Sequence, residues 1–67
     1  MRVLNFHEVE RAYEEVCGKP GTVQEIDFIL DLWNYERSGG QSPIIWPKKA
    51  GRRNAAKVVE YLREKYG

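Results

Sequence analysis

The sequence contains one cysteine, one histidine and no long run of apolar residues. Cys17 cannot form an intramolecular disulfide, and Cys17 with His7 does not make a recognisable Cys/His metal cluster. No stretch of about 18 apolar residues is present, so we expect no membrane-spanning helix. The first ten residues turn acidic and lack the apolar core of a signal peptide, which favours a reducing, cytoplasmic location.

The length of 67 residues is near the lower limit at which one hydrophobic core is sufficient for folding. A chain this short, without disulfides or metal, must depend on well-packed helices, on a partner or on self-association. We therefore expect a single helical domain over residues 1–67.

Charge is unevenly distributed along the chain, although the net charge is only +1. Residues 1–37 contain four Lys/Arg and eight Asp/Glu, whereas residues 38–67 contain seven Lys/Arg and two Asp/Glu. Such asymmetry indicates a polar surface with a function, or two halves that attract each other. A solvated surface without a partner is the alternative.

The most apolar helical stretch is 22–37, which we expect to be the central helix of a small bundle. Thr22 and Glu25 have the spacing of a capping box, in which each side chain accepts from the other residue's backbone N–H. Helical spacing predicts two apolar stripes, which is typical of a helix that is contacted on two sides. The first contains Val23, Ile26, Ile29, Leu30 and Trp33, and the second contains Phe28, Leu32 and Tyr35.

A first helix is predicted from Phe6 to Cys17. Asn5 and Glu8 have capping-box spacing, and Gly18 followed by Pro20 ends the helix. Its buried stripe is predicted to contain Phe6, Val9, Tyr13, Val16 and Cys17. The connection from Gly18 to Gly21 is short, so helices one and two should be antiparallel neighbours.

The third predicted helix follows a proline-flanked segment. Pro43 and Pro47 favour extended backbone before them, so Ile44, Ile45 and Trp46 should be extended. This segment either covers the helical pair, with a two-strand pairing to residues 2–4 as one form, or exposes part of its apolar surface. Pro47 could open an early turn, but Gly51 favours a helix start at Gly51 or Arg52. The helix should bury a stripe of Ala55, Val58, Val59, Leu62 and Tyr66.

No set of residues has the spacing of a catalytic or metal site. His7 and Cys17 are separated by roughly 15 Å along one helix, so they cannot form a dyad. Asp27 and Asp31 lie one turn apart on a polar stripe, and two carboxylates alone do not make a metal site. We therefore expect neither an enzyme nor a cofactor.

A basic run is the strongest functional signal in the sequence. It contains five cations in ten residues, with no acidic residue between them: Lys48, Lys49, Arg52, Arg53 and Lys57. Cations at the start of a helix are poorly placed for helix stability, but they are suited to binding phosphate. Trp46 or Tyr61 could stack on a base. We therefore predict a nucleic-acid-binding module for DNA or RNA. The alternative is a protein–protein interaction domain that docks through Ile45 and Trp46, or through the acidic faces of the first two helices.

Overall fold

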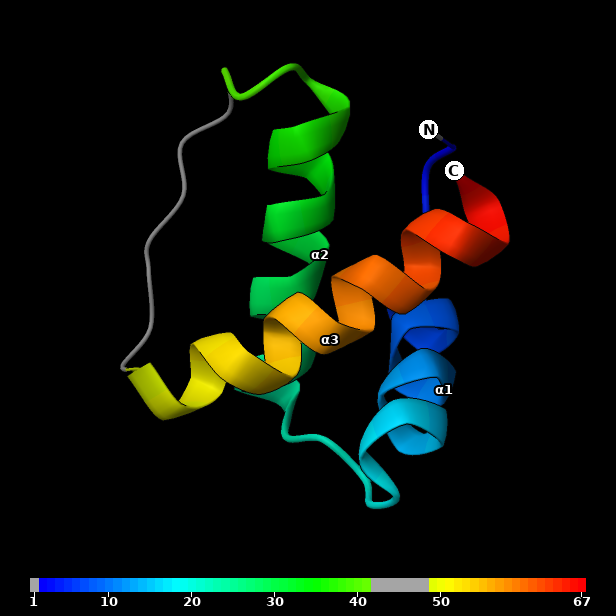
Figure 1. Cartoon of the computed structure of the whole chain (residues 1–67), viewed down its shortest axis with the longest axis vertical. Helices are drawn as coiled ribbons and strands as arrows, with labels where there is room; N and C mark the ends of the chain where they lie inside the picture. Colours follow the sequence, from blue (N-terminus) through cyan, green and yellow to red (C-terminus); the bar gives the residue numbers. More distant parts are fainter. Residues whose placement is uncertain (1, 42–48) are drawn as a thin grey trace.

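Three α-helices pack against one another in the computed structural model (Figure 1): α1 Phe6–Cys17, α2 Val23–Arg37 and α3 Lys49–Tyr66. The structure describes residues 2–41 and 49–67, with the side chains of 2–41 and 52–67. These residues form no β-strand, and the predicted all-α, three-helix fold is confirmed. The extended segment expected at 44–46, and therefore its pairing with residues 2–4, lies outside the described residues.

Both predicted capping boxes are present and determine where α1 and α2 begin. The Asn5 side chain accepts from the Glu8 N–H at 2.9 Å, and the Glu8 carboxylate accepts from the Asn5 N–H at 3.2 Å. Thr22 and Glu25 make the equivalent pair, with both bonds at 3.1 Å. Gly18 ends α1 in the left-handed conformation with φ 72°, as a glycine can without a Cβ clash.

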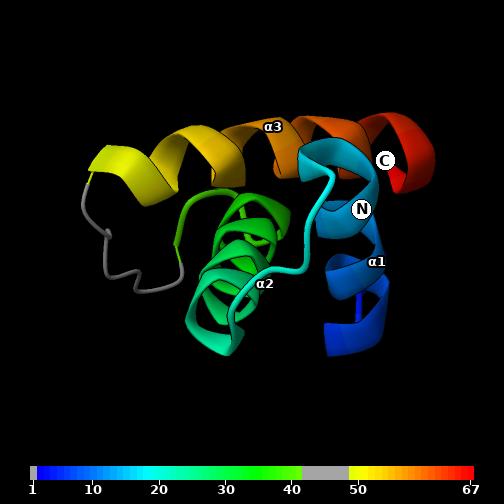
Figure 2. The ribbon, with the colours of Figure 1, turned by 90° about the horizontal axis from the view of Figure 1, so that it is seen from below.

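The helices form two layers. In Figure 1 the chain runs down α1 and back up α2, so these helices are antiparallel as predicted. Figure 2 shows that α3 lies across both of them and forms the second layer by itself. Each helix contacts the other two, so α2 is no more central than α1 or α3.

The core is formed by one line of residues from each helix together with Leu4. Trp33 is the largest fully buried side chain. The buried residues are Leu4, Val9, Ala12, Tyr13, Ile26, Ile29, Trp33, Ala55, Val58, Val59 and Leu62. The placement of Val23 in the buried stripe was wrong, because this side chain is 65% exposed. Its position is at the edge of the stripe centred on Ile29 and Trp33, at the first residue of α2.

Two polar side chains in the core make hydrogen bonds between distant parts of the chain. The Trp33 indole Nε1 donates to the Arg2 carbonyl at 2.7 Å. The Tyr13 hydroxyl donates to the Glu25 carboxylate at 2.5 Å and accepts from the Asn54 amide at 3.4 Å. The Tyr13 network therefore joins α1, α2 and α3 at one point.

The start of α3 differs from the sequence prediction. Its first residue is Lys49, two or three residues before the expected start at Gly51 or Arg52. Glycine within a helix costs about 1 kcal/mol relative to alanine. That cost is small beside the burial of Ala55, Val58, Val59 and Leu62 further along the same helix, so the helix continues through Gly51.

Gly21 allows the α1–α2 connection to lie close to the core. A Cβ at this position would meet the Ile26 Cδ1 at 2.9 Å and the Tyr13 ring at 3.0 Å. Only glycine fits this approach without displacing a fully buried neighbour.

Candidate nucleic-acid interface

The packing of α3 determines which of its residues are exposed. Ala55, Val58, Val59 and Leu62 are buried along one line of the helix, as the sequence predicted, and Tyr66 is half-buried at its end. The opposite line of α3 therefore faces away from α1 and α2. In Figure 2 no described element covers that side of α3.

Three of the five predicted contacts lie together on the first half of α3. Arg52, Arg53 and Lys57 are exposed. Arg53 and Lys57 are one turn apart on the line opposite the buried residues, and neither is in an ion pair within the part of the chain that the structure describes. Lys48 and the side chain of Lys49 lie outside the described residues.

The second half of the same line is acidic. Glu60 and Glu64 are exposed and continue the spacing of Arg53 and Lys57 by whole helical turns. The outer face of α3 is therefore basic at its N-terminal half and acidic at its C-terminal half. Helical spacing in the sequence carries this signal, although the predicted site was limited to the basic run.

The other cations of α3 bind groups within the protein. Arg63 makes two hydrogen bonds to the Glu36 carboxylate of α2, one of them 2.9 Å long, and this carboxylate raises the pKa of Arg63. The Lys65 ammonium lies 5.8 Å from the Tyr61 ring centre and 5.5 Å from that of Tyr66, and both tyrosines raise its pKa. Arg63 therefore joins α3 to α2, Lys65 lies beside two rings of its own helix, and neither lies on the line of Arg53 and Lys57.

The aromatic residues suggested for base stacking differ in their placement. The Tyr61 hydroxyl donates a hydrogen bond to the Glu15 carboxylate of α1, and this bond raises the pKa of Tyr61. The Tyr61 ring is half-buried beside Lys65. Trp46, and with it the docking pair Ile45 and Trp46, lies outside the described residues.

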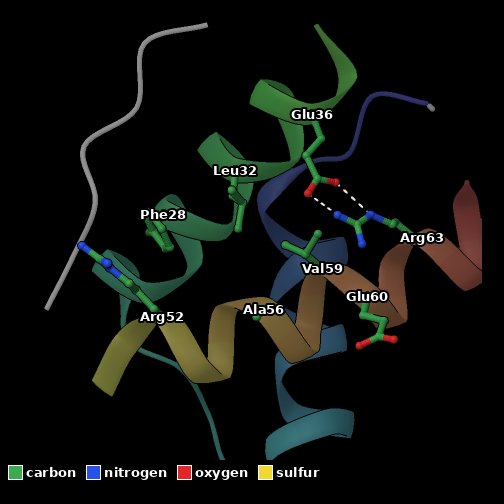
Figure 3. A pocket seen from close by; sticks show the side chains of 8 residues that line it. All are labelled: Phe28, Leu32, Glu36, Arg52, Ala56, Val59, Glu60 and Arg63. Atoms are coloured by element: carbon green, nitrogen blue, oxygen red, sulfur yellow. Dashed lines mark hydrogen bonds and ion pairs between the residues drawn. The ribbon is translucent and has the colours of Figure 1, made fainter. Parts of the chain in front are cut away.

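A groove of about 380 Å³ runs between α2 and α3, beside the basic half of the outer face of α3 (Figure 3). Phe28 and Leu32, from the second predicted apolar stripe of α2, form its floor with Ala56 and Val59 of α3. Arg52 lies at one end, and the Glu36–Arg63 ion pair closes the other. Glu60 lines the outer edge. Residue spacing predicted the apolar stripe of α2, but it could not predict that α3 leaves part of this stripe exposed in a groove.

The remaining candidate residues do not come together. His7 is exposed, with its Nδ1 3.5 Å from the Glu10 carboxylate, and Cys17 is a half-buried free thiol at the other end of α1. Among the described residues, no three His, Cys, Asp or Glu side chains are placed to hold a metal ion. Asp27 and Asp31 are exposed on α2.

Comparison of the chain with models of protein families, with curated proteins and with solved structures finds no match. Within the described ranges 2–41 and 49–67, no helix combines the length and apolar character needed to cross a bilayer.

Proposed function

We propose that this domain binds nucleic acid mainly through phosphates, at the basic run that includes the start of α3. The contacts are the cations expected from the sequence: Lys48, Lys49, Arg52, Arg53 and Lys57. The observation that carries the proposal is the exposure of Arg53 and Lys57, one turn apart and outside any ion pair among the described residues. Cations presented in this way neutralise phosphates and release the counterions bound to them.

The packing of α3 supports a site of defined geometry rather than a cationic tail. Four buried residues hold α3 against α1 and α2. Arg53 and Lys57 point away from that contact, so removing either side chain should leave the core intact. The exposed Ala56, between Arg53 and the α2–α3 groove, is small and permits close approach of a nucleic-acid backbone to this side of the helix.

The salt dependence of binding to a short DNA duplex tests the proposal. With about four phosphate contacts, log K against log[salt] should have a slope of about −3.6, at about 0.9 per contact. Lys57→Ala should flatten the slope by about 0.9, and both Lys57→Ala and Arg53→Ala should leave the circular dichroism spectrum unchanged.

Arg37→Ala is the matched control for these two variants. Arg37 is an exposed arginine at the last residue of α2, and in Figure 1 this end of α2 is the one farther from the start of α3. Its removal lowers the net charge equally but should leave the slope unchanged. Failure to bind both DNA and RNA at low salt would exclude the proposed function.

A second candidate function, protein–protein interaction, is favoured by the groove between α2 and α3. Its apolar floor and its rim of both charge signs are complementary to an amphipathic helix that carries both signs beside an apolar stripe. Helical peptides selected on the wild-type protein should lose binding to Leu32→Gln, while the affinity for DNA stays the same. Peptides that bind both proteins equally would exclude the groove as the docking site.

A further inference from the structure

We propose that the nucleic acid is duplex DNA, that the first half of α3 lies in its major groove, and that Arg53 contacts the base edges there. This inference rests on the proposed function and extends it from phosphate binding to a class of substrate and a mode of recognition. It depends on three features of the described residues: the position of α3, the directions of its cations and the placement of its tyrosines.

The position of α3 suits entry into a groove. It forms one layer by itself, and in Figure 2 its N-terminal turns extend beyond α2. A helix with its side chains is about 10–12 Å wide, and the B-DNA major groove is about 12 Å wide. The minor groove, about 6 Å wide, cannot admit such a helix.

The directions of the three described cations match the two walls and the floor of that groove. Arg53 lies opposite the buried line and therefore faces the floor. Arg52 lies about 100° from Arg53 on the side of α3 that lines the α2 groove, and Lys57 lies one turn after Arg53, about 40° to its other side. In such a complex Arg52 and Lys57, on either side of Arg53, would be the side chains that reach the two phosphate backbones. The Arg53 guanidinium can donate two hydrogen bonds to guanine O6 and N7.

Single-stranded nucleic acid fits the described surface less well. Proteins that bind single strands stack bases on exposed aromatic rings. On α3, Tyr61 and Tyr66 are both half-buried; Tyr61 is bonded to Glu15, and the Arg2 guanidinium lies 4.5 Å from the Tyr66 ring centre. Duplex RNA is also disfavoured, because its major groove is too deep and narrow for protein side chains to read.

The acidic second half of α3 limits the contact to the first half. Glu60 and Glu64 lie on the line of Arg53 and Lys57, where a phosphate backbone would be repelled. Only the N-terminal half can therefore approach DNA closely. This charge distribution also fixes which end of α3 enters the groove.

The first arm of the test compares substrates. Fluorescence anisotropy is measured with a labelled 20-base-pair DNA duplex of mixed sequence, with one of its strands alone, and with the RNA duplex of the same sequence. The proposal expects the tightest binding to the DNA duplex. Equal or tighter binding to the single strand or to duplex RNA would overturn the inference and leave the proposed function intact. Binding to none of the three would overturn both.

The second arm tests Arg53 itself. Replacing the guanines of a duplex selected by the wild-type protein with 7-deazaguanine removes the N7 acceptor without changing the phosphates. Wild-type affinity should fall by about fivefold or more, the lower end expected for loss of a specific base contact. Arg53→Ala should show no such fall, whereas Lys57→Ala, which lacks a phosphate contact, should show the full fall. An equal response of wild type and Arg53→Ala would contradict the base contact.

Discussion

The indole nitrogen of Trp33, in the middle of the molecule, is hydrogen-bonded to the backbone carbonyl of Arg2 at 2.7 Å. This bond satisfies the one polar atom of the largest fully buried side chain. It also fixes the residues that precede α1 against α2, next to the point where Leu4 enters the core. Trp33 therefore acts both as core volume and as an anchor for the N-terminal residues.

Replacing Trp33 should be the most damaging single change in the core. Trp33→Ala leaves a large cavity and an unsatisfied Arg2 carbonyl, and we expect a loss of about 3–5 kcal/mol in the free energy of unfolding. Trp33→Phe retains most of the apolar volume and should lose less. Urea denaturation followed by circular dichroism measures both. Wild-type stability of Trp33→Ala would contradict the burial described for this residue.

The capping box at the start of α2 contributes less than Trp33 to the free energy of unfolding, and its contribution can be measured separately. Thr22→Ala removes the acceptor for the Glu25 N–H and should lower the free energy of unfolding by about 1 kcal/mol. Such a loss moves the thermal midpoint of a domain this small by several degrees. Thr22→Ser keeps the hydroxyl and is the matched control. Equal midpoints for Thr22→Ala and Thr22→Ser would show that the hydroxyl is not the group that matters.

The Tyr13–Glu25 hydrogen bond should make stability depend on pH at both extremes. The bond and burial raise the pKa of Tyr13 from 10.0 to about 12, and the same bond lowers the pKa of Glu25 below its ordinary value of 4.5. The neutral tyrosine is favoured in the folded state, so its contribution is complete below pH 10 and is lost between pH 10 and about 12. The carboxylate is also favoured there, so its contribution is present above 4.5 and is lost as the pH falls through the lowered value.

Two variants separate these contributions in denaturation experiments across pH. Tyr13→Phe should reduce the loss of stability between pH 10 and 12, while the loss due to Tyr61 remains in both proteins. Glu25→Gln should reduce the loss at acid pH. A Tyr13→Phe protein with an unchanged alkaline profile would mean that the tyrosine titrates as it does in the unfolded chain.

Residue spacing was sufficient to predict α1 and α2 with their ends, because these ends are determined locally, whereas the start of α3 was predicted two or three residues too late. The capping side chains Asn5 and Thr22 bond to N–H groups three residues away, and Gly18 needs only its own backbone conformation to end α1. The buried line of α3 follows from spacing in the same way. The prediction that Val23 is buried was wrong for a different reason. Helical spacing gives the direction of a side chain around its helix, but not whether a neighbouring helix extends far enough to cover it.

Contacts between helices could not be predicted in this way. Tyr13 bonds to partners 12 and 41 residues away, and the Arg63–Glu36 pair joins α3 to α2. Arg63 could be interpreted from the sequence only as a cation near a helix end. The basic surface was visible as a run of residues, but the directions of Arg53 and Lys57 depend on which side of α3 packs.

Gly21 offers a test of how closely the α1–α2 connection packs. Gly21→Ala would place a methyl group about 3 Å from the Tyr13 ring and from the Ile26 side chain, both fully buried. We expect a loss of about 1–3 kcal/mol from overpacking, measured by urea denaturation. Lys19→Ala, in the same connection but exposed, is the control and should be nearly neutral. A more stable Gly21→Ala protein would show that the Tyr13 and Ile26 side chains shift to accommodate the added methyl group.

The position of Tyr13 has a consequence for cooperativity. Its hydroxyl bonds to a residue of α2 and a residue of α3, and its ring lies under the α1–α2 connection. Separation of any one helix therefore exposes this side chain and breaks at least one of its bonds. A partly unfolded form with one helix detached therefore cannot keep both hydrogen bonds of the Tyr13 hydroxyl. The slowest-exchanging amides of α1, α2 and α3 should accordingly exchange through one common opening of the whole domain.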